Sequence, residues 1–379
     1  MNSQRNEISG LRERNAEFAF SLYSAVAGEQ KGNLVMAPLP FSIALSLLLN
    51  GADAQTQQEI LEVTKLAGMS LDDINQQNLR LQKILEQISV SGPDTFILAN
   101  SLWASLPLAF APAFLEAGRL YYSAEITSVE PQELPARVSE WSREKTRGLV
   151  DMKLQETDFA LLSATYFKGR WECPFKEENT KLEKFHPVHS AARPVPMMSQ
   201  QGEYLYFEGG NFQLVVLPYS TASMYFLLPK KGGLFSKHSL DEIEQQALRD
   251  AWIITQPMAH LPGLVKIPKF KLRYHGDFLP VLQKLGLQRM FDTFDSLRPA
   301  VTHPDGARVE QVLQNSTITV DEKGAEAASV LAMGMRAGSA PGWTPPKPFE
   351  FIADRPFCFW ITDDQTGSIL FIGRVEDPQ

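Results

Sequence analysis

Histidine is the side chain most often used in metal binding and acid–base catalysis, and the chain contains six of them. His186 and His189 form the closest pair, within Phe-His-Pro-Val-His. On a strand, residues three apart point to opposite faces, and Pro187 disfavours a helical turn at this place. Neither geometry brings the two imidazoles together, and no HExxH pattern occurs elsewhere. We therefore expect no metal site.

The sequence motifs of common enzymes are missing as well. There is no GxSxG elbow, no Walker A loop and no GxGxxG after a strand. Paired carboxylates occur at Asp72–Asp73 and Asp363–Asp364, in polar contexts typical of the first turn of a helix and of a turn tip. No set of residues assembles a catalytic site, so we expect a protein that is not an enzyme and needs no cofactor.

The segment Val320–Arg336 carries conflicting structural signals. Its Ala, Glu, Leu and Met residues favour a helix, but Gly324 precedes them where a helix would need a capping side chain. With a period of two, small side chains fall on one face, at Ala325, Ala327 and Ser329. A segment that can be loop, helix or strand is a candidate conformational switch.

Charge and composition exclude several functional classes. The net charge is −8 over 379 residues, which argues against nucleic-acid binding as the main role. Lys266, Lys269, Lys271 and Arg273 cluster locally, and we interpret them as a solvated strand face, with a functional basic patch as the alternative. No apolar run reaches the ~18 residues of a membrane span. The N-terminus lacks the apolar core of a signal peptide, so we expect an extracellular protein if such a peptide has been trimmed and a cytoplasmic one otherwise.

Two cysteines, Cys173 and Cys358, are too few for a disulfide framework. We expect both to be buried thiols and the fold to be held by its hydrophobic core.

Helical patterns dominate the first part of the chain and strand patterns the second. Helices are predicted at Arg12–Ala27, Ser42–Asn50, Asp73–Gln87, Ala111–Tyr122 and Glu133–Lys145. Strands are predicted at Ala160–Phe167, Phe212–Pro218, Met224–Pro229, Gly263–Arg273, Ser316–Asp321, Phe357–Thr362 and Ser368–Val375. No linker-rich boundary separates the two parts, which favours one interleaved α+β domain over residues 1–379.

Several blocks of the chain, taken together and in order, resemble the serpin family of protease inhibitors. Val320-Asp-Glu-Lys-Gly-Ala-Glu-Ala-Ala is similar to the hinge that begins the reactive-centre loop of that family. Phe351-Ile-Ala-Asp-Arg-Pro-Phe, with Thr366-Gly-Ser-Ile-Leu-Phe-Ile-Gly-Arg-Val, resembles the C-terminal signature. Five more blocks match family landmarks, beginning at Asn33, Ile97, Tyr166, Val195 and Ile267.

The resemblance implies a single serpin domain of about nine helices and three β-sheets, with a gap available in the central sheet. It also implies an exposed hinge and reactive-centre loop at residues 320–350. A target serine protease, or additionally a cysteine protease, attacks this loop and forms a covalent acyl-enzyme. The cut loop then enters the central sheet as a new strand and traps the protease. The implied partner is the protease, with a monomeric inhibitor able to form loop-sheet polymers, and with neither nucleic acid nor membrane as partner.

The residues themselves indicate whether the loop can insert. The hinge implied by the resemblance comprises Glu322, Gly324, Ala325, Glu326, Ala327, Ala328 and Ser329. Its inward face is small, Glu326 points outward, and no proline lies between Gly324 and Ala337, so every inserted residue keeps its backbone donor. These features favour an inhibitor. The alternative is a non-inhibitory carrier or chaperone, which a bulky or charged inserted face would have favoured.

The scissile bond is open between several positions. The family's usual spacing from Gly324 places the residue before the bond at Gly338, with Ser339 after it. Arg336 would suit a trypsin-like pocket, although cleavage there shortens the inserted strand by about 7 Å. The other candidate bonds are Ala337–Gly338 and Met335–Arg336. The proline-rich exit side, Ser339–Glu350, reads as a spacer, with a contact to the protease as the alternative.

The family also implies two regions where the central sheet opens. Trp171 corresponds to the Trp at the top of the sheet, called the breach. Ala37, Pro40, Ser163 and Gln314 occupy the positions, called the shutter, where the family has serines, an Asn and a His. Two hydroxyls are therefore lost, although Ser163 and Gln314 remain able to pair with each other.

Overall fold

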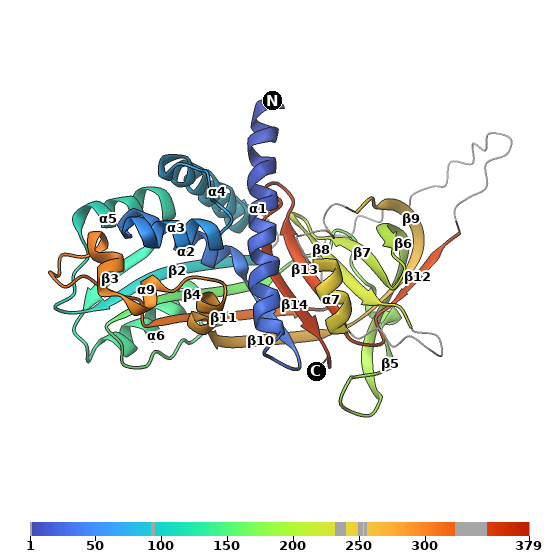
Figure 1. Cartoon of the computed structure of the whole chain (residues 1–379). Helices are drawn as coiled ribbons and strands as arrows, with labels where there is room; N and C mark the ends of the chain where they lie inside the picture. The colour runs from blue at the N-terminus through green and yellow to red at the C-terminus, as the bar shows by residue number, and fades with distance from the viewer. Residues whose placement is uncertain are drawn as a thin grey trace.

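A computed structural model describes residues 2–91, 95–231, 240–248, 253, 256–322 and 347–378. Figure 1 shows an α+β architecture in which helices surround two sheets. The α-helices are α1 Asn2–Ala27, α2 Pro38–Leu48, α3 Ala54–Val63, α4 Leu71–Ser91, α5 Pro112–Ala117, α6 Leu134–Lys145, α7 Leu240–Leu248, α8 Leu279–Lys284 and α9 Arg289–Asp292. The predicted α+β class is confirmed.

The strands form a five-stranded and a nine-stranded sheet. The smaller sheet has the order β10-β11-β4-β2-β3, and the larger has β1-β14-β13-β8-β7-β6-β9-β12 with β5 paired to β6. The strands are β1 Leu34–Met36, β2 Thr95–Ser105, β3 Glu125–Val129, β4 Phe159–Lys168, β5 Lys181–Phe185, β6 Arg193–Glu208, β7 Phe212–Pro218, β8 Ala222–Pro229, β9 Ala259–Pro268, β10 Phe270–Asp277, β11 Gln311–Val320, β12 Phe349–Ile352, β13 Phe357–Asp363 and β14 Ile369–Val375.

Hydrogen bonding joins the described strands into two sheets, whereas three sheets were expected. The reason is the 16-residue strand β6, which pairs with β5 at its start, with β9 over most of its remaining length and with β7 at its end. A strand of this length joins two groups of strands into one continuous network.

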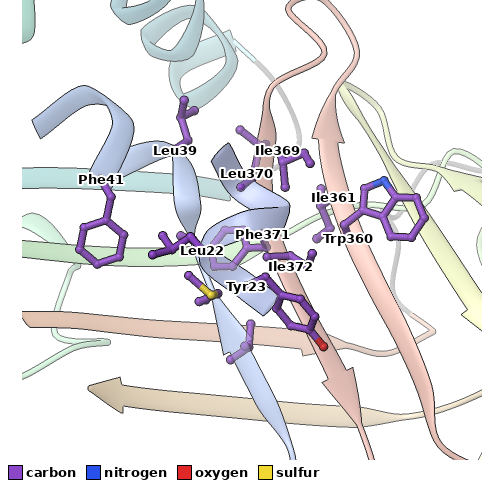
Figure 2. Close-up of a cluster of buried hydrophobic side chains, with 14 of the residues drawn as sticks. Leu22, Tyr23, Leu39, Phe41, Trp360, Ile361, Ile369, Leu370, Phe371 and Ile372 are labelled. Carbon is purple, nitrogen blue, oxygen red and sulfur yellow. The ribbon is translucent and has the colours of Figure 1, made fainter. Parts of the chain in front are cut away.

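The core lies between the two sheets and is built on α1 and α2. Every residue of α2 is buried, as expected for its long apolar run, and Pro38 and Pro40 open the helix. Figure 2 shows Leu22 and Tyr23 of α1, Leu39 and Phe41 of α2 and Ile361 of β13 among the buried cluster. This central core fixes the inner face of the five-stranded sheet.

The other face of the five-stranded sheet is covered by α6. Trp141 of α6 packs edge-on against Trp103 of β2, with ring centroids 6.4 Å apart. Val138 and Leu134 of α6 belong to the same buried cluster as Leu162 of β4. The sheet that contains the candidate site is therefore covered on both faces.

Several sequence predictions need correction. The predicted strand Gly263–Arg273 is two strands, β9 and β10, which belong to different sheets and are separated at Lys269. Pro268 has no backbone donor, and the Lys269 N–H donates to Pro196 O, so the ladder ends there. The predicted helix Ala111–Tyr122 is confirmed in extent, although it consists of the short helix α5 continued by a π-helix at Gly118–Tyr122.

The two cysteines lie in different environments. Cys358 on β13 is buried, whereas Cys173 is exposed, so the prediction of two buried thiols is wrong for Cys173. Among the described helices, none combines the length and the hydropathy needed to cross a membrane.

Candidate functional site

The candidate site is a junction in the five-stranded sheet at which two neighbouring strands, β11 and β4, run parallel. β11 runs parallel to β4 from Gln311 opposite Ala160 to Ile318 opposite Phe167. β10 is antiparallel to β11, and β2 is antiparallel to β4. We call the β4–β11 junction the seam. Over these paired residues the seam is closed, so the expected gap in the sheet is not present there and the strands must part before another strand can enter.

The direction of the seam strands decides what can be inserted. The chain leaves β11 at Val320, so a segment that folds back into the sheet runs antiparallel to β11. Because β4 is parallel to β11, the same segment is antiparallel to β4 as well. Insertion replaces one parallel pairing by two antiparallel pairings, which are slightly more stable per residue. The seam is thus suited to accept the segment that follows β11.

The inner side of the seam is tied to α2 through Gln314. The Ala37 N–H donates to Gln314 Oε1 at 2.8 Å, and Gln314 Nε2 donates to Ala37 O at 2.7 Å. Ser316 Oγ donates to the same Oε1 at 3.0 Å, and Gln314 is fully buried. This pair of hydrogen bonds holds β11 to the start of α2.

Ser163 and Pro40 lie beside this link but do not join it. Ser163 is opposite both Gln314 and Asn100 in the sheet, and its buried Oγ has no hydrogen-bond partner. The Ser163–Gln314 pair that the sequence allowed is not formed, because the Gln314 amide faces the Ala37 backbone. Pro40 O accepts from Asn100 Nδ2 at 3.0 Å, so Asn100 of β2 makes a second link to α2 beside the seam, and the sequence did not point to it.

Trp171 closes the end of the seam at which the chain leaves β11. Its ring stacks on Tyr219 with centroids 4.0 Å apart, and its Nε1–H donates to Asp321 O at 2.9 Å. Phe175 packs edge-on against the same indole at 6.0 Å. A buried indole needs a partner for its N–H, and here the partner is the backbone that leads out of β11. Trp171 therefore ties the end of the seam to the backbone that leaves β11.

Comparison with known proteins identifies the family. The family model described as "Serpin (serine protease inhibitor)" matches residues 13–378. The chain belongs to the serpin family. The relative Putative serpin-Z5 of Oryza sativa subsp. japonica is 30% identical, over 93% of this chain and 86% of that protein. Serpin B4 of Homo sapiens is 27% identical over 98% of this chain and all of the relative.

Solved serpin structures show the same fold. The structure of Arabidopsis AtSerpin1 in its native stressed conformation matches with a TM-score of 0.85 and 26% identity, covering 97% of this chain and 98% of that one. The insect protein Serpin48 of Tenebrio molitor matches with a TM-score of 0.82 and 24% identity, covering 98% and 99%. Membership of this family supports a role in protease inhibition in general, with proteases as targets, since serpins as a family are inhibitors rather than catalysts.

The residues predicted to form the hinge lie only partly within the part of the chain that the structure describes. Gly324 and the residues through Ser329 lie outside it, as do the candidate reactive positions Arg336, Ala337, Gly338 and Ser339. Glu322 is described: its side chain is only 7% exposed and pairs with Lys269 at 2.7 Å. Thr180 Oγ1 donates to Glu322 Oε1 at 2.8 Å. The residue at the root of the hinge is therefore fixed from two directions.

The partners of Glu322 were not recognised from sequence. Lys269 was grouped with Lys266, Lys271 and Arg273 as a solvated face, but Lys269 and Lys266 are both ion-paired, the latter with Glu183 at 2.6 Å. Thr180 carried no signal, because a lone threonine before a strand is common. The position of Lys269 between β9 and β10 is the feature that could have drawn attention to it.

We expect the link from Glu322 to make the hinge sensitive to acid. Burial opposes ionisation of Glu322, but the hydrogen bonds from Lys269 and Thr180 outweigh it and hold the pKa below the usual glutamate value. A lowered folded-state pKa stabilises the protein above the unfolded pKa, and this contribution is lost as the pH falls through the folded value. Glu322→Gln should therefore lower the thermal midpoint at pH 7 by an amount that disappears on acidification.

The measurement is the thermal midpoint of both proteins between pH 7 and pH 3. A hydrogen bond to a charged group contributes about 1.5–3 kcal/mol, so we expect Glu322→Gln to lower the free energy of unfolding at pH 7 by roughly that amount. Glu183→Gln, which breaks the Lys266 pair away from the hinge, is the matched control. Equal midpoints for wild type and Glu322→Gln at every pH would contradict the prediction.

Proposed function

We propose that this serpin is a suicide-type inhibitor of serine endopeptidases that traps the acyl-enzyme by inserting its cleaved loop into the seam. The observation that carries the proposal is the parallel β4–β11 pairing, which directly precedes the loop in the chain. In the described residues of this sheet, the segment after β11 finds a position antiparallel to both of its neighbours only at this junction. The similarity to AtSerpin1 in its native stressed conformation adds support, since the closed five-stranded sheet is the form that still has insertion ahead of it.

The composition of the loop supports the same proposal. Ala325, Ala327 and Ser329 present small side chains on one face, and the segment from Gly324 to Ala337 contains no proline. A strand that enters between two existing strands must bury one face against the core and pair its backbone on both sides. Charged side chains on that face would oppose entry, and their absence, together with the small residues that lead the segment, favours insertion over a carrier role.

The proposal is tested by mixing the purified protein with trypsin, elastase and a papain-type protease. We expect an SDS-resistant complex with at least one serine protease, together with a thermal midpoint that rises strongly after the loop is cut. The cysteine protease arm shows whether the target range extends beyond serine proteases. A loop that is cut without complex formation and without a gain in thermal stability would support a non-inhibitory carrier or chaperone instead.

For the reactive bond, we propose Gly338–Ser339, from the family's spacing to the hinge Gly324. Arg336–Ala337 is the alternative, because a trypsin-like pocket pairs an arginine with a carboxylate. Mass spectrometry of the C-terminal fragment released by each protease distinguishes them, since the fragment begins at Ser339 in the first case and at Ala337 in the second. A fragment that begins elsewhere would overturn both assignments.

A further inference from the structure

A cluster of buried polar side chains fastens α7 to the body, on elements distant from the seam. Tyr23 of α1 donates its hydroxyl to Glu244 Oε1 of α7 at 2.6 Å. Arg374 of β14 lies 3.5 Å from Glu244 Oε2, and Cys358 Sγ of β13 lies 3.8 Å from the Tyr23 hydroxyl. Figure 1 shows α7 beside α1 and β13, and Figure 2 shows Tyr23 at the edge of the apolar core. The cluster therefore joins four elements.

The charges in this cluster do not balance. Three carboxylates face the single Arg374 guanidinium: Asp241 at 3.0 Å, Glu376 at 3.1 Å and Glu244 at 3.5 Å. Glu244 is the most buried of the three and lies farthest from the cation. Arg374 also donates to the backbone oxygens of Gln30 and Gly32, so its Nε–H and one Nη2–H are shared with the backbone.

The surrounding groups offer little compensation for Glu244. Lys31 reaches Asp241 at 3.5 Å and is 71% exposed, so water screens its charge. β8, which also packs on α7, contributes no Asp, Glu, Lys, Arg or His to the contact. The groups that face Glu244 from the described elements are thus Tyr23, Cys358, Arg374 and Asp241. A buried carboxylate with one cation shared among three is poorly placed to stay ionised.

We propose that Glu244 is a proton-binding site at neutral pH and that its proton fastens α7 to α1 and β14. With the proton bound, the cluster keeps one guanidinium and two carboxylates, the half-exposed Asp241 and the buried Glu376, and the Glu244 carboxyl keeps its hydrogen bond to Tyr23. With the proton lost, a further negative charge is buried beside Asp241, and the attachment of α7 weakens. The site acts as a pH-dependent fastening for one helix.

The electrostatic environment supports this assignment. Burial raises the pKa of Glu244 to about 7, the nearby Asp241 adds to the increase, and the Tyr23 hydrogen bond and the Arg374 charge oppose it. An unfolded glutamate has a pKa of about 4.3. Since the folded value is the higher one, the stabilisation is fully present below about pH 4.3 and is lost as the pH rises through about 7.

The test measures hydrogen-exchange protection of the α7 amides between pH 5 and pH 8, corrected for the intrinsic exchange rate. One proton linked to opening lowers the protection factor by up to about tenfold per pH unit between pH 5 and about pH 7, and the decline levels off above the folded-state pKa. Glu244→Gln, a neutral isostere of the protonated acid, should remove this dependence and exceed wild type in protection at pH 8. Identical pH profiles for the two proteins would overturn the proposal.

Two further variants distinguish proton binding from a merely structural role. Asp241→Asn removes a charge that raises the Glu244 pKa, so the midpoint should move to lower pH. Tyr23→Phe removes a hydrogen bond that lowers this pKa, so the midpoint should move to higher pH. The carboxylic-acid infrared band gives the midpoint directly, even if Glu244→Gln does not fold. Midpoints that do not move, or that both move in one direction, would contradict the assignment.

Discussion

Replacing Ala327 with Glu is expected to convert the protein from an inhibitor into a substrate of its target protease. Ala327 lies on the small face that is proposed to enter the seam, against the core packed beneath β4 and β11. Burying an unpaired carboxylate costs several kcal/mol. A barrier increase of about 3 kcal/mol slows insertion more than about a hundredfold, since each 1.36 kcal/mol is a factor of ten in rate. Deacylation then wins, and the protease is released with the loop cut.

The matched control is Ala328→Glu, one residue further along. By the alternation of a strand, Ala328 lies on the opposite face with Glu326, where a carboxylate already occurs naturally. We expect this variant to keep near-normal yields of SDS-resistant complex, whereas Ala327→Glu yields cleaved protein alone. The readout is the ratio of complex to cleaved inhibitor on a denaturing gel. Equal ratios for the two variants would contradict insertion with this face inward.

The local sequence pattern was sufficient to predict the bounds of elements that have one clear periodicity or a sharp boundary. The strand β7 has the bounds that were predicted for it, Phe212–Pro218, because its branched residues are enclosed by turn residues. Ser70 likewise caps the start of α4 locally, since the Asp73 N–H donates to Ser70 Oγ and the Ser70 hydroxyl donates to Asp73 Oδ2. Both features depend on residues close together in the chain.

Elements whose pattern depends on the whole fold were missed. Thr95–Ser105 forms the long central strand β2, although the early part of the chain reads as mostly helical. Both faces of β2 are covered, by α2 and by α6, so polar and apolar residues do not alternate along it. The junction at Lys269 was missed because the same run of strand-forming residues serves two sheets.

The candidate site shows the same division. Positions could be assigned from the resemblance, so Trp171 and Gln314 were found before their surroundings were known. Their hydrogen-bond partners could not be assigned, because Gln314 bonds to the backbone of Ala37 and not to the hydroxyl of Ser163. That choice follows from how α2 is placed under the sheet. A hydrogen-bond partner remote in sequence is a property of packing, which composition and period do not encode.

Two contacts fix β11 on either side of its exit, and they differ in kind. In the pair of Glu322 with Lys269 the lysine is 39% exposed, so water can replace part of what is lost. In the pair of Gln314 with Ala37 both residues are fully buried, so water does not reach the groups that lose their partner. Removing the inner contact should therefore cost more than removing the outer one, and it should act on the opening of the seam.

We expect Gln314→Leu to be the most destabilising change at the seam. Leucine keeps the apolar part of the side chain but leaves the Ala37 N–H and C=O without partners, and each unpaired buried group costs about 1–3 kcal/mol. The closed sheet is weakened by roughly 2–5 kcal/mol on this basis. Thermal inactivation should therefore accelerate more than about tenfold, because 1.36 kcal/mol is already a factor of ten in rate. The measurement is loss of inhibitory activity against time at a fixed temperature.

The orphaned hydroxyl of Ser163 provides the control. Ser163→Ala removes a buried Oγ that has no hydrogen-bond partner. The variant therefore loses no hydrogen bond and no longer buries an unpaired polar group. Its inactivation rate should equal or fall below that of wild type, although Ser163 lies opposite Gln314 in the sheet. Size-exclusion chromatography of the heated samples adds a second readout, because a seam that opens early exposes strand edges and lets chains associate. Faster inactivation of Ser163→Ala than of Gln314→Leu would mean that the seam is held by contacts other than the Gln314–Ala37 pair.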